Sequence, residues 1–340
     1  MSSSDRYLSP SEAARRLGVS AKALRLYERR GLVAPLRTAA GWRAYGPDQM
    51  ARAAEVAALR ALGLSLAEVA RVLEGEARGL EPALAAHQSA LEARLRGLAA
   101  TVDRVRALRE GLARGQAPTA GQLAGLLAPG SGPGVAFDLP WPWGGERFEL
   151  GEAAPLTYIT GPLGSGKTRL ARRLAEALPD AAFIGLQRLD DGASAARARL
   201  AADPALRARA EAALAWLAED GAAISDALVA LVEALEADGP AALVIDVVEQ
   251  GLDQAAQEAV IAWLRRRGPG ARPLFLLTRS CAILDLQAVG PDEAIILCPA
   301  NHSPPFRVAA RPGAYGYEAL ATCLASPDVR ARVARPPEAA

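Results

Sequence analysis

Lysine is almost absent from this chain. Of its 39 basic residues only two, Lys22 and Lys167, are lysine, and arginine supplies the rest. Cysteine is also rare, with three residues near the carboxyl end and no CxxC pair. This number and spacing exclude a disulfide framework and a zinc motif. Cys298 and His302 could pair on a metal, but a buried thiol beside a proline-flanked loop is the favoured interpretation.

Long apolar runs are missing as well. No uninterrupted stretch reaches the roughly 18 residues that span a bilayer, and the start, MSSSDRYLSP, lacks the apolar core of a signal peptide. We therefore expect a cytoplasmic protein without a membrane partner. With 340 residues, of which 51% are hydrophobic, the chain can form about two or three domains with cores of their own.

The net charge of +1 hides an asymmetry along the chain. Residues 1–116 carry 19 Lys and Arg against 12 Asp and Glu, whereas the remainder carries 20 against 26. The amino-terminal part is therefore basic, at +7, and the rest is acidic, at −6. A basic module on an acidic body favours a polyanion as the partner of the first part.

The first 76 residues have the pattern of a winged helix-turn-helix. Ser9 is a suitable N-cap for the first helix, and Gly31 ends the second. The pattern predicts four helices and, around the bend at 39–41, a short hairpin or wing. The predicted helices span residues 10–17, 21–30, 47–62 and 65–73.

A long helix with an apolar seam follows. Apolar residues recur at every seventh position: Leu84, Leu91, Leu98, Val105 and Leu112. This repeat is typical of a coiled coil. The helix would be about 50 Å long, more than a small domain covers, so we predict homodimerisation through residues 80–114. Packing of the helix on the chain's own carboxyl-terminal domain is the alternative.

These elements together resemble the MerR family of transcription regulators. LRLYERRGL at 24–32 is similar to the family's R-Y-Y-E-x-x-G-L recognition-helix signature, and GWRAY at 41–45 is similar to its G-x-R-x-Y wing end. Leu26 departs from it, replacing an aromatic residue. The resemblance covers about residues 6–114. It implies that the second helix enters the major groove of double-stranded DNA, that the long helices pair in a dimer, and that RNA polymerase is a candidate partner.

The residues expected to contact DNA are basic or aromatic side chains of the first two helices and the wing. Arginine and lysine can bind phosphates or guanine edges, and tyrosine can bind the DNA backbone. A solvent-exposed surface residue is the alternative for each of them taken singly. They are Arg15, Arg16, Lys22, Arg25, Tyr27, Arg29, Arg37, Arg43 and Tyr45.

Residues 115–135 are rich in Gly, Pro and Ala, which is typical of a linker, and they contain one segment with helical character, at 120–127. Members of the MerR family that sense metals carry cysteines just after the dimer helix. This region has none, so metal sensing is not expected.

GPLGSGKT at 161–168 matches the phosphate-binding pattern GxxxxGK[ST]. An apolar run precedes it and an amphipathic segment follows, which is the order of strand, loop and helix that the motif requires. Lys167 would reach the β and γ oxygens of ATP, which arginine's planar fork cannot replace, and Thr168 would bind Mg²⁺. The predicted nucleotide-binding residues are Gly161, Pro162, Leu163, Gly164, Ser165, Gly166, Lys167, Thr168 and Arg169.

AALVIDVVEQGLD at 241–253 predicts a buried strand that ends in Asp246, a second ligand for the magnesium ion. This segment resembles ABC-type ATPases and their RecF-like and OLD-like relatives. The resemblance gives Glu249 and Gln187 catalytic roles close to the metal and the attacking water. For Glu249, an ordinary carboxylate at the start of a helix is the alternative.

The chain also departs from the ABC pattern. Val247 stands where a water-polarising glutamate is expected, Arg279 replaces the switch histidine, and no LSGGQ signature occurs. Valine cannot act as a general base, so we expect at most a weak ATPase. Trp141 or Trp143 could stack on adenine, but core packing is the favoured interpretation for both.

The sequence therefore predicts a multidomain protein. Its parts are an all-α winged helix-turn-helix domain (1–76), a dimerisation helix (80–114), a linker (115–135), an α/β P-loop NTPase domain (136–326) with an alanine-rich helical insertion at 193–237, and a disordered tail (327–340). The favoured function is a dimeric transcription regulator modulated by ATP. An ATP-dependent DNA-processing enzyme with a MerR-like docking module is the alternative.

Overall fold

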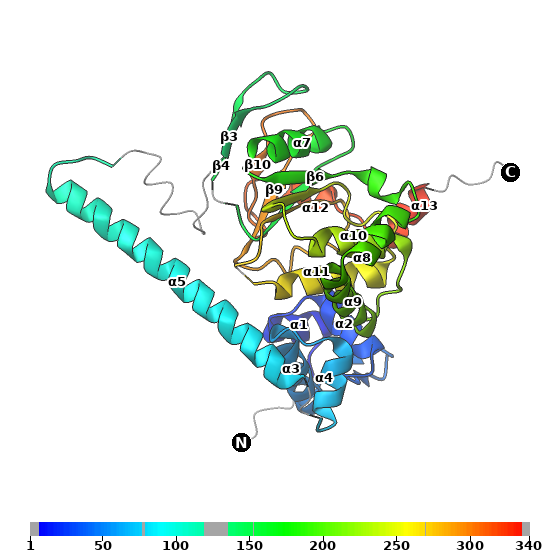
Figure 1. Cartoon of the computed structure of the whole chain (residues 1–340). Helices are drawn as coiled ribbons and strands as arrows, with labels where there is room; N and C mark the ends of the chain where they lie inside the picture. The colour runs from blue at the N-terminus through cyan, green and yellow to red at the C-terminus, as the bar shows by residue number, and fades with distance from the viewer. Residues whose placement is uncertain (1–6, 77–78, 119–134, 152, 269, 335–340) are drawn as a thin grey trace.

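The computed structural model describes residues 7–76, 79–118, 135–151, 153–268 and 270–334. Figure 1 shows three parts, namely a helical module at the amino terminus, the long helix α5, and a larger α/β domain that carries the sheet. This multidomain arrangement confirms the predicted fold class. The predicted linker lies outside the described residues except at its ends, and so does its helical segment at 120–127.

The amino-terminal module follows the predicted elements closely. Ser9 caps the first helix, Gly18 follows it with φ +67°, and Ser65 caps the last. The wing strands pair antiparallel, Leu36 with Ala44. Leu24, Val56 and other apolar residues form a core of the module's own. Its elements are α1 (Pro10–Leu17), α2 (Ala21–Arg29), β1 (Leu36–Arg37), β2 (Arg43–Ala44), α3 (Pro47–Ala61) and α4 (Leu66–Leu73).

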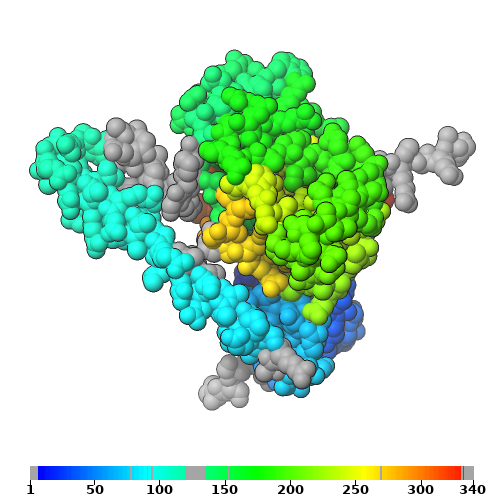
Figure 2. Space-filling model, viewed as in Figure 1, coloured from blue at the N-terminus to red at the C-terminus, as the bar shows by residue number. Residues whose placement is uncertain are grey.

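Helix α5 (Leu80–Ala113) projects from the module as a rod, away from most of the α/β domain (Figures 1 and 2). Only its start, at Leu80 and Ala83, packs on the module's core. The seam is exposed, with exposed fractions from 37% to 69% at Leu84, Leu91, Leu95, Leu98, Val102, Val105 and Leu112. The chain's own domain therefore does not cover the seam along the described helix.

The α/β domain is built on a six-stranded sheet in the order β10-β9-β5-β8-β7-β6. All its pairs are parallel except β10 with β9. Neighbouring residues of β7 point to opposite faces, Leu243 into one core and Val244 into the other, so both faces are covered. The strands are β5 (Leu156–Thr160), β6 (Ala181–Ile184), β7 (Ala242–Ile245), β8 (Leu274–Leu277), β9 (Glu293–Leu297) and β10 (Phe306–Arg307).

Helix α7 (Lys167–Ala177) and the hairpin of β3 (Val135–Asp138) and β4 (Arg147–Leu150) cover one face of the sheet. Helices α9 (Pro204–Glu219), α10 (Asp226–Glu236), α11 (Gln254–Arg266) and α12 (Tyr317–Thr322) cover the other.

The predicted helical insertion is present as α8 (Ser194–Ala202), α9 and α10. The guanidinium of Arg199 binds both oxygens of the buried Glu233, at 2.6 and 2.7 Å, and so joins α8 to α10. The 3₁₀ turn η1 (Leu186–Leu189) connects β6 to this insertion.

The predicted disordered tail is wrong for residues 327–334, which form helix α13 (Pro327–Ala334). Ser326 caps it, because the Ser326 Oγ accepts a hydrogen bond from the backbone N–H of Val329. Proline at its first position and Asp328 in its first turn also favour a helix start. Residues 335–340 lie outside the described residues. None of the described helices is both long and apolar enough to cross a membrane.

Candidate functional site

The P-loop connects β5 to α7 and depends on its glycines. The φ angles of Gly161, Gly164 and Gly166 are +153°, +79° and +88°. Residues other than glycine rarely adopt such values. A Cβ at Gly161 would lie 2.3 Å from the Cys298 carbonyl oxygen, and one at Gly166 would lie 2.6 Å from the Trp143 ring. The conformation of the loop therefore requires glycine at these positions.

The side chain of Lys167 lies over the loop. Its Nζ donates hydrogen bonds to the carbonyl oxygens of Gly161 (2.9 Å) and Pro162 (2.6 Å). Burial lowers the pKa of Lys167 from its usual value. The Ser165 Oγ is a third acceptor, at 3.4 Å. A half-buried ammonium whose acceptors are all uncharged can also bind phosphate oxygens, because an anion would offset the cost of its burial.

Thr168 and Asp246 form the second part of the site. The Thr168 Oγ1 lies 3.2 Å from Asp246 Oδ2 and 3.4 Å from Oδ1. Asp246 follows β7 directly and is 6% exposed, and burial raises its pKa, while the hydrogen bond from Thr168 opposes the rise. One hydroxyl and one carboxylate of this kind fit a Mg²⁺ ion that binds a nucleotide.

These residues surround a cavity of about 400 Å³. Trp141 is 69% exposed at its edge, and the Arg169 guanidinium stacks on its ring at 3.9 Å. Trp143 is buried in the core, as the favoured interpretation had it, but the same interpretation is wrong for the exposed Trp141. Of the predicted nucleotide-binding residues, six line this cavity, namely Leu163, Gly164, Gly166, Lys167, Thr168 and Arg169.

Glu249 also lines this cavity and is 3% exposed. Its Oε1 accepts hydrogen bonds from the Arg279 backbone N–H (3.1 Å) and from the Arg330 guanidinium of α13. Its Oε2 has no partner among the described residues. Val247, also in the cavity lining, has φ +44°, which is strained for a β-branched residue.

Gln187 is not brought to this site. It lies in η1, is exposed, and lines a different hollow beside α8 and α10. The next residue, Arg188, contacts the end of β7 instead and donates hydrogen bonds to the carbonyls of Asp246 (2.9 Å) and Val247 (2.8 Å). The sequence contains no signal that predicts contact with the end of β7 for Arg188 and not for Gln187.

The residues predicted to contact DNA fall into three groups. Some are buried or ion-paired within the module, some are exposed, and Lys22 and Arg29 contact the α/β domain. Tyr27 and Tyr45 are buried, at 4% and 0% exposure, so their burial does not support the predicted DNA contacts. The Tyr45 hydroxyl donates to Glu28, and burial raises the pKa of Tyr45. Arg43 also binds Glu28, at 2.6 Å. Arg15, Arg16, Arg25 and Arg37 are exposed.

Comparison with known proteins separates the two halves. Residues 8–76 match the model of the MerR HTH family regulatory proteins, and residues 146–277 match that of the AAA ATPase domain. The chain joins a MerR-type DNA-binding module to a P-loop ATPase domain. Both parts of the predicted resemblance are thereby confirmed at the level of these two domains.

Solved structures match each half separately. HiNmlR, a MerR family regulator bound to promoter DNA, is 20% identical over 33% of this chain and 92% of its own, with a TM-score of 0.26. A putative metal-chelate type ABC transporter is 15% identical over 52% and 83%, with a TM-score of 0.37. A putative cobalt transport ATP-binding protein is 18% identical over 52% and 78%, with a TM-score of 0.33. Similarities of this size carry no further conclusion.

The recognition helix α2 of the MerR-type module packs against the ATPase domain. The Lys22 Nζ donates to the carbonyl oxygen of Cys281 at 2.5 Å, and Arg29 forms an ion pair with Glu258 at 3.0 Å. Just after the helix, Arg30 donates to the Asp220 carbonyl at 3.1 Å. Two of the predicted DNA-binding residues, Lys22 and Arg29, are therefore bound to the ATPase domain.

A second set of contacts fixes α3 and α4 on the end of α9. Asp220 is 4% exposed, and its carboxylate accepts two hydrogen bonds from Arg60, at 2.6 and 3.1 Å, and one from the Leu66 N–H at 2.8 Å. The Ser65 hydroxyl lies 2.8 Å from a Glu219 carboxylate oxygen. No motif in the sequence indicates a role for any of these residues.

Proposed function

We propose that the protein is a dimeric, sequence-specific DNA-binding transcription regulator whose affinity for DNA depends on ATP binding in its ATPase domain. The docked position of α2 carries this proposal. Lys22 and Arg29 lie on one face of α2, together with Leu26, and in helix-turn-helix proteins the face of this helix that includes its amino-terminal residues meets the bases. A helix held by Cys281 and Glu258 cannot enter a major groove at the same time.

Two short segments connect the nucleotide cavity to the docked helix, and they support the coupling. One runs from Arg279, in the cavity lining, to Cys281, which holds Lys22. The other runs from Glu249, also in the lining, to Glu258 on α11, which holds Arg29. A change at the cavity therefore has a short route to both docking contacts.

The two segments are also linked to each other. Glu249 accepts the Arg279 N–H, and the Ser280 hydroxyl donates to the buried Gln257 at 2.6 Å. Such cross-links make the segments move together, which is what a coupled site requires. When ATP and Mg²⁺ bind, Lys167 and the loop N–H groups would hold the phosphates, and Thr168 with Asp246 would hold the ion.

The test is footprinting and gel-shift titration of DNA upstream of the protein's own gene, with and without ATP and Mg²⁺. The coupling free energy between two allosteric sites is typically about 1–3 kcal/mol. We therefore expect ATP to change the operator affinity by about 5- to 150-fold. Linkage requires operator DNA to change ATP affinity by the same factor. Identical footprints and equal affinities in both conditions would refute control by ATP.

The alternative, an ATP-dependent DNA-processing enzyme, is distinguished by truncation after residue 116. A regulator truncated in this way keeps operator binding and loses its response to ATP, whereas an enzyme loses its defining activity on DNA. A regulator of this kind would act in the cytoplasm, with RNA polymerase as its functional partner at the promoter.

Dimerisation is expected to depend on the exposed seam of α5. Replacing Leu91 and Leu98 by glutamate places charges in the predicted interface, so the protein should become monomeric in light-scattering measurements. As a matched control, glutamate at Ser89 and Ala100, on the opposite side of the helix, should leave the dimer intact. Equal masses for the two double variants would contradict the proposed interface.

ATP hydrolysis is expected to be slow, below about 1 s⁻¹, the lower end of typical enzyme turnover, because Val247 occupies the position of the expected base. Residual turnover should depend on Glu249, which is a buried carboxylate in the cavity lining, besides the predicted magnesium ligand Asp246. Phosphate-release assays on Glu249→Gln check this. Residual turnover that is the same in Glu249→Gln would exclude Glu249 as the base.

A further inference from the structure

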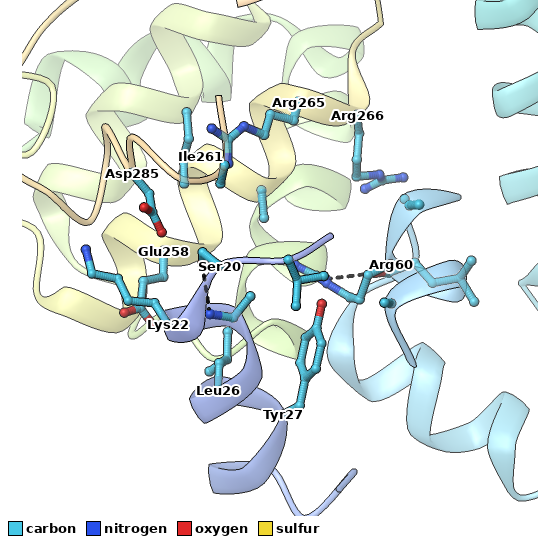
Figure 3. Close-up of a pocket in the computed structure, with 18 of the residues that line it drawn as sticks. Ser20, Lys22, Leu26, Tyr27, Arg60, Glu258, Ile261, Arg265, Arg266 and Asp285 are labelled. Carbon is cyan, nitrogen blue, oxygen red and sulfur yellow. Dashed lines mark hydrogen bonds between the residues drawn. The ribbon is translucent and has the colours of Figure 1, made fainter. Parts of the chain in front are cut away.

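A second large cavity lies where the recognition helix meets the ATPase domain. Its volume is about 410 Å³, close to that of the nucleotide cavity. Figure 3 shows Lys22, Leu26 and Tyr27 of α2 on one side, and Glu258, Ile261 and Arg265 of α11 on the other. Both the MerR-type module and the ATPase domain therefore supply its walls.

The walls are mainly apolar. Val19, Leu26, Ala57, Leu64 and Ile261 belong to the lining, together with several further alanines. Pockets of a few hundred cubic ångströms with apolar walls and a few polar groups are typical of small-molecule sites.

The polar groups of the lining are unevenly satisfied. Arg60 is held by Asp220, and Arg265 by Glu293 at 2.8 and 3.0 Å. The Tyr27 hydroxyl, on a residue that is 4% exposed, has no hydrogen-bond partner among the described residues, and it points toward the α11 side of the cavity (Figure 3).

Arg266 is the second group available to a ligand. It is exposed, its guanidinium lies 4.6 Å from the centre of the Trp216 ring, and within the described chain it forms no ion pair. A cation held against an aromatic wall at the edge of an apolar cavity can bind an anionic group whose apolar body lies inside.

We propose that this cavity binds a small amphipathic organic anion, with the apolar body between α2 and α11, a hydrogen bond to the Tyr27 hydroxyl and the anionic group at Arg266. The inference rests on the proposed regulation of DNA binding. Because both domains form the walls, the ligand binds only the docked form. By linkage it stabilises that form and lowers the affinity for DNA.

The test uses the full chain and two fluorescent probes with the same apolar body. They are 8-anilinonaphthalene-1-sulfonate, which is anionic, and N-phenyl-1-naphthylamine, which is neutral. Ala57→Phe fills the cavity, whereas Ala58→Phe changes the next residue of α3, which is exposed and outside the lining. We expect Ala57→Phe to weaken binding of the sulfonate at least about tenfold and Ala58→Phe to leave it unchanged. The amount of probe that binds to the α5 seam should be the same in both variants, so it does not affect their comparison.

Arg266→Gln should weaken binding of the sulfonate about tenfold and leave the neutral probe unaffected. Asp220→Ala, which loosens the docked form, should weaken both probes. Equal sulfonate affinity in the two phenylalanine variants would overturn the site. Equal loss of both probes in Arg266→Gln would overturn the anion contact, and unchanged affinities in Asp220→Ala would overturn binding to the docked form.

Saturating sulfonate should also lower operator affinity in the unmodified protein and not in Ala57→Phe, and an unchanged operator affinity would overturn the link to DNA binding. The probe titrations themselves contain neither ATP nor DNA. If ATP has no effect on the operator, the proposed function fails while the measured cavity binding stands. If both phenylalanine variants bind sulfonate equally, the cavity proposal fails and control by ATP is unaffected.

Discussion

Replacing Lys167 by alanine should weaken ATP binding by about 10- to 150-fold. The variant removes the ammonium that faces the phosphates, and charge-assisted hydrogen bonds of this kind contribute about 1.5–3 kcal/mol. Lys167→Arg should also bind weakly, because a planar guanidinium does not fit beside the Gly161 and Pro162 carbonyls that now accept from the ammonium. Calorimetric titration with ATP and Mg²⁺ measures both variants.

Arg173→Ala is the matched control, since it removes a cation from the same helix, α7. Arg173 forms a surface ion pair with Glu176 at 3.5 Å and does not line the nucleotide cavity. Its ATP affinity should equal that of the unmodified protein. Full ATP affinity in Lys167→Ala would refute the assignment of the loop as the phosphate site.

The local elements could be predicted from sequence because their signals are local. Ser9 caps the first helix in the structure as its position suggested, and the glycine pattern of 161–168 specifies one loop conformation. Asp246 ends a buried strand, as an apolar run followed by aspartate predicts. In each case the residues that determine the structure are a few positions apart, so a single window contains them all.

The docking of the two halves could not be predicted in this way. Arg60 and Asp220 are 160 positions apart, and each looks ordinary in its own segment, one near the end of a helix and the other just after one. The prediction of DNA contacts for Tyr27 and Tyr45 went beyond its local signal for a related reason. An aromatic residue in a DNA-binding signature suits either DNA contact or core packing, and only the burial of Tyr27 and Tyr45 decides between them.

Replacing Asp220 by alanine should raise operator affinity at least about tenfold. Asp220 and Arg60 have side-chain exposures of 1% and 14%, and removing one partner of a buried pair typically costs about 3–5 kcal/mol. Here that cost falls on the docked form, because Arg60 regains water when the module separates from α9. The affinity gain stops once the undocked form predominates, since apparent affinity scales with the competent fraction.

Gel-shift titration on the footprinted operator measures the effect, with Asp238→Ala as the control. Asp238 binds Arg209 at the surface and is 83% exposed, so its loss should leave DNA affinity unchanged. Glu258→Ala should give a smaller gain than Asp220→Ala, because its partner Arg29 is 57% exposed. Circular dichroism establishes that each variant is folded. A folded Asp220→Ala protein with unchanged or lower operator affinity would show that docking of α2 does not restrict DNA binding.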